Sequence, residues 1–147
     1  MAGAGKSSVG KELAKMLNLK LIDSDTLIEE QYDKSLQKIL DDEGYIKLRK
    51  IENVVLKNLS LNETVLSTGG SAVYSEEAME YIKKNSIVIF LEVPFGQILE
   101  RVPSFHDRGF AKAASQSIED AFEERQELYK KYSHHRVSNT KDLYSCV

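Results

Sequence analysis

The feature that most constrains this chain is a run of small residues at its start, followed at once by a helical pattern. Residues 3–7, Gly-Ala-Gly-Lys-Ser, match all but the first residue of the pattern G-x-x-x-x-G-K-[ST]. The leading glycine would lie one position before Met1. A helix over residues 6–17 is predicted by the spacing of the apolar side chains that follow: Val9, Leu13, Met16 and Leu17.

This pattern has a direct chemical meaning. Small residues let successive backbone N–H groups point inward around a polyphosphate, and the following helix offers its positive end. Lys6 can reach the β- and γ-phosphates of a nucleoside triphosphate, and the Ser7 hydroxyl can bind Mg²⁺. The alternative reading is a flexible glycine-rich terminus that precedes an ordinary helix.

Composition limits the class of protein. A chain of 147 residues fits one domain, since domains average about 150 residues. The longest apolar run, residues 87–91, is far shorter than the ~20 residues of a membrane helix. A net charge of −3 argues against a large nucleic-acid-binding face. One cysteine, Cys146, cannot form an internal disulfide, so we expect a cytoplasmic protein.

Helices and strands alternate along the chain. Strands are predicted at residues 19–22, 64–67, 87–91 and 135–137, the third of them fully buried, and helices at 75–84, 95–102 and 118–132. Two further helices are expected to start at the candidate caps Thr26 and Ser35, and Gly44 should end the second. The apolar residues at positions 48, 51, 55 and 59 predict another helix after Gly44. Strands separated by helices predict parallel pairing, and therefore one three-layer α/β/α domain over residues 1–147.

A phosphate-binding loop of this kind needs a strand that leads into it, and none precedes Gly3. That strand is ordinarily central in a doubly wound sheet. We therefore expect its neighbours to lack a pairing partner, the core to be open and the stability to be low. The pattern predicts a chain that was trimmed from a longer one or that starts at an internal methionine.

Two further polar segments follow predicted strands. Asp23 and Asp25 come directly after the first strand, and Gly69-Gly70 come after the second. The carboxyl ends of these strands should lie beside the loop, where open α/β sheets bind ligands. Asp23 could bind the waters of a metal ion and Asp25 an acceptor hydroxyl, while the glycines allow close backbone approach. The alternatives are a polar turn that caps a helix and a simple tight turn.

Four arginines are candidates for binding anionic groups. Arg49 flanks the buried face of a predicted helix, and Arg125 lies on the long C-terminal helix. Arg101 and Arg108 bracket an irregular loop, and an arginine in such a loop can neutralise charge on a transferring phosphoryl group. Taken alone, Arg49 or Arg125 is more often a solvated charge than a ligand.

Together these residues resemble the shikimate kinase family of small P-loop kinases, whose fold is like that of nucleoside-monophosphate kinases. The resemblance covers about residues 1–137 in family order. The matching segments are Gly3-Ala4-Gly5-Lys6-Ser7-Ser8-Val9-Gly10-Lys11, Asp23-Ser24-Asp25 with Ile28-Glu29, Leu48-Arg49 with Glu52, Ser67-Thr68-Gly69-Gly70, Arg101 with Arg108, and Glu124-Arg125 with Leu128-Tyr129. On this resemblance the chain is trimmed at both ends.

The resemblance implies transfer of the γ-phosphate of ATP to the 3-hydroxyl of shikimate, with Mg²⁺ as cofactor, by a protein expected to be monomeric. It implies a lid at about residues 103–114 and an acceptor-binding region at about 26–60. Lys6, Asp25 and Arg108 would be catalytic, and Ser7 and Asp23 would hold the metal. The implied ATP-binding residues are Gly3, Ala4, Gly5, Lys6, Ser7, Ser8, Arg101 and Arg108, and the implied shikimate-binding residues are Asp25, Arg49, Gly69, Gly70 and Arg125.

Three positions depart from the family pattern. Ser71 replaces a third glycine, Gly109 replaces a proline after the lid arginine, and Glu127 stands where a proline is common. The usual closing helix at the C-terminus is also absent from the pattern. Two other functions therefore stay open: another small-molecule P-loop kinase for a sugar acid or a nucleotide, and a non-catalytic nucleotide-binding remnant.

Overall fold

The computed structural model describes residues 1–102, 104 and 110–141, in which helices and strands alternate as predicted. Most element bounds agree with the sequence pattern to within two residues. The order is α1 (Lys6–Leu17), β1 (Lys20–Asp23), α2 (Ser24–Tyr32), α3 (Leu36–Lys57), β2 (Thr64–Ser67), the 3₁₀ turn η1 (Ala72–Tyr74), α4 (Glu76–Asn85), β3 (Ile89–Glu92), α5 (Phe95–Arg101), α6 (Ile118–Tyr132) and β4 (His135–Ser138).

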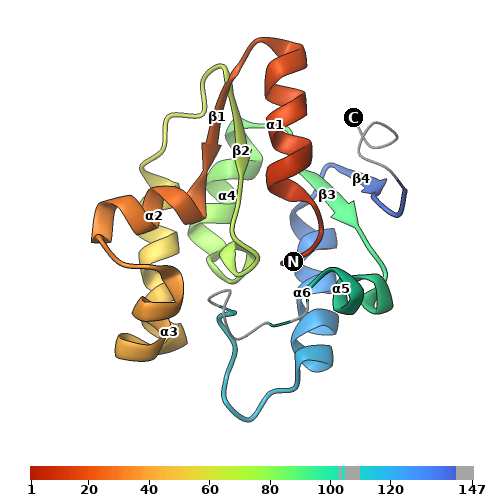
Figure 1. Cartoon of the computed structure of the whole chain (residues 1–147). Coiled ribbons are helices and arrows are strands. Elements are labelled where there is room, and N and C mark those ends of the chain that lie inside the picture. Colours follow the sequence, from red (N-terminus) through yellow and green to blue (C-terminus); the bar gives the residue numbers. More distant parts are fainter. Residues whose placement is uncertain (103, 105–109, 142–147) are drawn as a thin grey trace.

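The strands form two parallel pairs. In one pair Lys20 of β1 lies opposite Thr64 of β2, and in the other Ile89 of β3 lies opposite His135 of β4. Figure 1 shows the two pairs beside each other, with the N-terminus of the chain near the space between them. Parallel pairing is therefore confirmed. No strand in the described part of the chain joins β2 to β3, as expected for a phosphate-binding loop without a leading strand.

Helices cover both faces of the first strand pair. Gly10 of α1 packs against Leu21 and Val65, while Leu66 packs in a cluster with Met79 of α4. Successive residues of a strand point to opposite faces, so Val65 and Leu66 are covered by different helices. Figure 1 shows α1 in front of this pair and α4 behind it. The three-layer α/β/α architecture is confirmed here.

The helix caps agree only in part with the prediction. Ser35 accepts a hydrogen bond from the backbone N–H of Lys38 and caps α3, as expected. The predicted cap at Thr26 is wrong, because α2 begins at Ser24 and Asp23 accepts the capping hydrogen bond from the Asp25 N–H. Gly44 has a non-helical backbone conformation (φ 80°, ψ 167°) at which two helical segments of α3 meet across a kink, so the predicted helix end at Gly44 is confirmed.

The prediction of a fully buried third strand is also wrong. β3 starts at Ile89, and the side chains of Ile87 and Ile89 are 73% and 45% exposed. In the described part of the chain β3 has a ladder partner on one side only, so its other edge is open. None of the helices described is long and apolar enough to cross a bilayer.

Candidate functional site

The residues just before α1 form a tight loop. Gly3 and Gly5 have φ angles of 76° and 84°, in the left-handed region that favours glycine. A β-carbon on residue 3 would lie 2.6 Å from Val102 Cγ2, and one on residue 5 would lie 2.5 Å from Asn139 Nδ2. The loop therefore needs glycine at both positions, for its backbone shape and for its close packing.

Residues from the C-terminal half brace this loop. The buried Asn139 side chain donates a hydrogen bond to the Ala4 carbonyl at 2.8 Å. Arg101 donates to the Asn139 carbonyl at 2.9 Å and to the Gly3 carbonyl at 3.4 Å. Arg101 thus lies against the loop backbone, at the end of α5 and next to β4.

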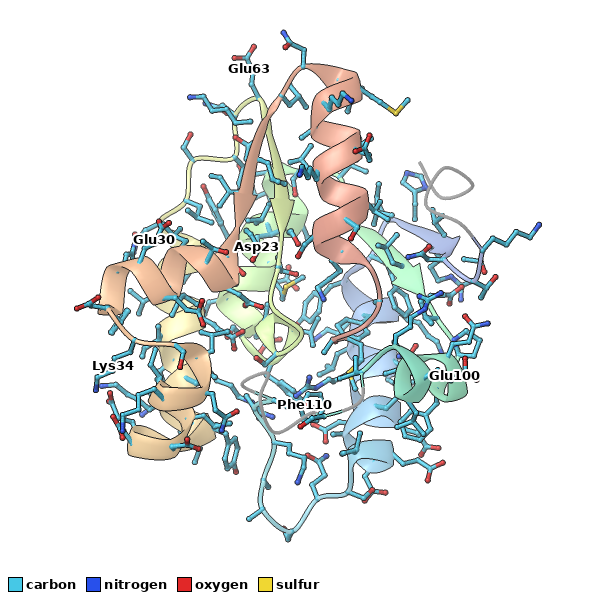
Figure 2. The ribbon with its side chains drawn as sticks, in the orientation of Figure 1. Asp23, Glu30, Lys34, Glu63, Glu100 and Phe110 are labelled. Atoms are coloured by element: carbon cyan, nitrogen blue, oxygen red, sulfur yellow. The ribbon has the colours of Figure 1, made fainter. Side chains whose placement is uncertain are left out.

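Lys6 and Ser7 open α1 next to the carboxyl end of β1. The Lys6 ammonium donates to the Met1 carbonyl at 2.8 Å, and burial lowers the pKa of Lys6 while the nearby carboxylates of Asp25 and Asp23 oppose that shift. The Ser7 hydroxyl donates to Asp23 Oδ2 at 2.7 Å. Figure 2 shows Asp23 at this end of β1, close to the start of α1.

The oxygen atoms of Ser7 and Asp23 suit a hard cation. Mg²⁺ typically takes one or two protein oxygens and completes its octahedron with phosphate oxygens and water. These two side chains are in direct hydrogen-bond contact, so one ion could bridge both. The described residues contain no group of three or more histidine, cysteine or acidic side chains that could hold a metal ion without a bound phosphate.

A cavity lies below the loop and joins segments that are far apart in the sequence. Its walls include Lys6 from the start of α1, Asp25 from α2, Glu52 from α3, Gly70 from the turn after β2 and Arg125 from α6. Phe110 and Ala111 close the remaining side, and Figure 2 shows Phe110 near the middle of the molecule. The cavity therefore combines cationic, anionic and backbone groups.

Two arginines converge on one oxygen atom at this cavity. Arg49 donates to the Ala111 carbonyl at 3.1 Å, and Arg125 donates to the same carbonyl at 2.8 Å. Arg125 is only 1% exposed, and its guanidinium lies 4.1 Å from the centre of the Phe110 ring. Guanidinium groups match carboxylates in a bidentate manner, so the pair can hold an organic acid where the carbonyl now lies.

Two carboxyl groups line the same cavity as Arg125. Asp25 Oδ1 is buried and has no hydrogen-bond partner among the described residues, and burial raises the pKa of Asp25 although Lys6 opposes the shift. The Ser71 hydroxyl lies 2.7 and 2.6 Å from the two carboxylate oxygens of Glu52. Burial raises the pKa of Glu52 to about 7, which the hydrogen bond from Ser71 partly opposes.

The glycines after β2 approach these groups closely. A β-carbon on residue 69 would collide with the carboxylates of Asp25 and Glu52. The Gly69 N–H donates to Ser24 Oγ at 2.9 Å, and the Gly70 carbonyl accepts from the Tyr129 hydroxyl at 2.7 Å. Both glycines therefore hold the turn within reach of a ligand in the cavity.

Comparison with known proteins agrees with this geometry. The family model of shikimate kinase matches residues 2–145. The chain belongs to the shikimate kinase family. The shikimate kinase of Aquifex aeolicus is 36% identical over 129 residues, which are 87% of this chain and 77% of the relative. That of Haemophilus influenzae is 38% identical over 131 residues, 86% of this chain and 73% of the relative.

Solved structures of shikimate kinases have the same fold. The enzyme from Acinetobacter baumannii, solved in complex with shikimate, superposes with a TM-score of 0.88 at 31% identity, over 97% of this chain and 82% of that one. The enzyme from Aquifex aeolicus superposes with a TM-score of 0.85 at 32% identity, over 99% of this chain and 87% of that one. The expectations of a P-loop kinase fold and of an ATP-dependent small-molecule kinase are confirmed for this member of the family.

In this member of the shikimate kinase family, most of the predicted site residues lie together. Lys6, Asp25, Gly70 and Arg125 line the cavity, and Arg49 reaches its rim. Gly69 borders Asp25, whereas Arg101 lies at the loop. Ser8 is exposed on the first turn of α1. Arg108, Gly109 and half of the predicted lid lie outside the described residues, whose part of that segment is Ser104 and residues 110–114.

The sequence did not single out several residues that shape the site. Tyr74 lies four residues after Gly70, and that proximity was a usable signal, whereas Ser71 was noted only as the replacement for a third glycine. Ala111 contributes a backbone oxygen, which has no signal in a sequence. Asn139 lies after the last strand, where nothing in the pattern marks it as a support for the loop.

Proposed function

We propose that this chain transfers the γ-phosphoryl group of ATP to the 3-hydroxyl of shikimate, a role supported by its membership in the shikimate kinase family. The observation that carries the proposal is the convergence of Arg49 and Arg125 on one oxygen acceptor. This acceptor position adjoins the cavity that also contains Lys6 and Asp25. One site thus offers groups for a carboxylate, a hydroxyl and a polyphosphate.

The substrate carboxylate would take the place of the Ala111 carbonyl. Both guanidinium groups donate to that carbonyl, so a carboxylate with two oxygens would satisfy them better. A ring held there by its acid group would direct its hydroxyls toward Asp25, whose Oδ1 has no hydrogen-bond partner in the described chain. A β-carbon on residue 70 would lie 3.3 Å from Arg125 Nη1, so glycine at this position leaves room for the ring.

The hydroxyl oxygen then attacks the γ-phosphorus. A new O–P bond forms, the bond from the γ-phosphorus to the β–γ bridging oxygen breaks, ADP leaves, and Asp25 accepts the hydroxyl proton. The raised pKa of Asp25 favours this proton transfer, because burial makes the protonated carboxyl more favourable. The Lys6 ammonium offsets charge on the β- and γ-phosphates, and the glycine loop supplies backbone N–H groups.

We propose Ser7 and Asp23 as the protein ligands of Mg²⁺, on the basis of their oxygen atoms in mutual contact. When bound, Mg²⁺ supplies charge neutralisation at the phosphate oxygens. We further propose that residues 103–114 act as a lid over the site, that residues 26–60 form the acceptor-binding region, and that Arg108 contributes a positive charge from the lid during transfer.

We also propose a monomeric, cytoplasmic protein with no nucleic-acid partner. The net charge of −3 opposes phosphate-backbone binding. Size-exclusion chromatography with light scattering tests the oligomeric state, and a dimer at assay concentration would contradict this part of the proposal.

A coupled assay for ADP release tests the proposed reaction. Shikimate with Mg-ATP should give turnover, whereas sugar acids and nucleoside monophosphates should give none. Turnover only with a sugar acid or a nucleotide would indicate a different kinase. Binding of ATP without turnover of any acceptor, by a folded protein, would favour the non-catalytic alternative. Crystals soaked with shikimate and ADP should show the carboxylate between Arg49 and Arg125.

A further inference from the structure

The 3₁₀ turn η1 places an aromatic side chain against both arginines of the site. Tyr74, at the end of η1, is half-buried, and the Arg49 guanidinium lies 3.4 Å from the centre of its ring. The Arg125 guanidinium lies 5.4 Å from the same centre. Arg125 Nε also donates a long hydrogen bond of 3.5 Å to the Tyr74 hydroxyl. One side chain thus contacts both cations.

The position of η1 explains this double contact. The turn follows Gly69 and Gly70 directly and packs against both α3, which carries Arg49, and α6, which carries Arg125. The backbone between the strand end and α4 therefore brings Tyr74 between two helices that are far apart in the sequence. Tyr74 is not in the cavity wall, so its effect on a ligand must pass through the arginines.

The contact with Arg49 has the geometry of a cation–π interaction. Cations within about 6 Å of a ring centre are attracted by the negative face of the ring. Arg49 Nε has no hydrogen-bond partner among the described residues, and the second ring near Arg49, that of Tyr45, is more distant at 5.0 Å. The Tyr74 ring is therefore the nearest aromatic support for this guanidinium.

Two like charges that share one acceptor repel each other, and the repulsion is larger where water is excluded. Arg125 lowers the pKa of Arg49, after the larger effect of burial, while Tyr74 opposes both. An aromatic face beside Arg49 compensates for part of this cost without supplying a counterion that would compete with a substrate carboxylate. The arrangement keeps both guanidinium groups oriented toward the Ala111 carbonyl.

We propose that Tyr74 is a positioning residue for the acceptor carboxylate, which it orients through Arg49 and Arg125. This inference rests on the proposed function, because it takes the carboxylate of shikimate as the ligand of the two arginines. The ring face is the part that acts on Arg49, and the hydroxyl contributes the weaker contact with Arg125.

Kinetics of two substitutions test the proposal. Tyr74→Leu removes the ring and should raise KM for shikimate about three- to thirtyfold, with KM for ATP unchanged. Tyr74→Phe keeps the ring face and should restore most of the affinity. Tyr81→Leu is the matched control, since Tyr81 is a partly buried tyrosine that bonds to the Leu59 carbonyl and contacts neither arginine. Equal rises in both KM values, or no rise, would overturn the positioning role.

A spectroscopic readout separates this inference from the proposed function. In wild-type protein with ¹⁵N-labelled arginine, the ring of Tyr74 should shift the Nε–H signal of Arg49. That shift should disappear in Tyr74→Leu and persist in Tyr74→Phe and Tyr81→Leu. An Arg49 signal that is the same in Tyr74→Leu and wild type would overturn the positioning role. Wild-type protein that does not bind shikimate would instead overturn the proposed function, while the arginine signals still report on Tyr74.

Discussion

Asn139 Nδ2 lies 2.5 Å from the position that a β-carbon on residue 5 would occupy. The contact joins the end of the last strand to the glycine loop at the start of the chain. The Asn139 amide also donates to the neighbouring Ala4 carbonyl, so an added methyl group would displace the residue that braces the loop. The shape of the phosphate-binding loop is therefore fixed in part from the C-terminal half.

Gly5→Ala should impair nucleotide binding and lower stability. Alanine at a φ of 84° costs about 1–2 kcal/mol, and the collision with Asn139 adds to this. Gly96→Ala is the control, because Gly96 lies in α5 with open space around it and should gain up to about 1 kcal/mol. Urea unfolding and ATP titration measure both effects. Unchanged ATP affinity in Gly5→Ala would contradict the assignment of the loop.

Lys6→Ala should reduce kcat by a factor on the order of 10²–10³, because it removes a charge aimed at the transferring phosphate. Far-ultraviolet circular dichroism should stay similar, since the helix begins at this residue and alanine favours helices. Lys11→Ala, an exposed change one turn further along α1, should leave kcat unchanged. Retained activity in Lys6→Ala would refute the role of this lysine.

Arg49→Ala should weaken shikimate binding far more than ATP binding. A charge-assisted hydrogen bond contributes about 1.5–3 kcal/mol, which corresponds to a KM increase of roughly 10- to 150-fold. Arg125→Lys is the better variant for the second arginine, because it keeps a positive charge in a buried position. Arg136→Ala, at an exposed ion pair with Glu92, serves as the control. Similar losses of affinity for shikimate and ATP would count against the carboxylate-binding role.

Glu52 should make stability depend on pH. Its pKa rises from 4.5 in the unfolded chain to about 7 in the fold, so the folded state binds the extra proton between these values. The stabilisation is present below about pH 4.5 and is lost as the pH rises through 7; at its largest it amounts to about 3 kcal/mol. Glu52→Gln should flatten this part of the profile. Asp25, Arg49 and Arg125 also act on this carboxyl.

Urea unfolding of wild type and Glu52→Gln at pH 5 and pH 8 measures this difference. As the pH increases, the free energy of unfolding of Glu52→Gln should increase relative to that of the wild type. Ser71→Ala, which removes the hydroxyl that bonds to both oxygens of Glu52, should raise the pKa of Glu52 further and move the transition to higher pH. Parallel pH profiles for wild type and Glu52→Gln would show that Glu52 does not titrate in this range.

Much of the fold could be predicted from local pattern. The helices over residues 6–17 and 118–132 have clear apolar spacing, and Ser35 caps its helix because its hydroxyl can reach the Lys38 N–H. The prediction of a cap at Thr26 was wrong because the helix begins earlier, where the Asp23 carboxylate accepts a hydrogen bond from the Asp25 N–H. Exposure of Ile89 could not be predicted, since burial of a strand depends on which neighbours it has in space.

The site was predictable where a residue type carries its own chemistry. Lys6 and Asp25 were candidates because of their charge and their place after glycines or a strand, and Arg125 because of its charge and the family resemblance. The fold brings all three to one cavity. Tyr74 and Asn139 act through contacts between segments about 25 to 135 residues apart. Such contacts depend on the packed structure, so spacing along the chain did not reveal them.

The separation of β1–β2 from β3–β4 has a consequence for hydrogen exchange. Since no ladder joins the pairs in the described part of the chain, backbone amides of the two pairs can lose protection as separate cooperative units. The glycine loop and the start of α1 together touch both pairs, because Ser7 of α1 contacts Asp23 and Ala4 of the loop contacts Asn139. A nucleotide that rigidifies this loop would therefore slow exchange in both halves at once and make them open as one.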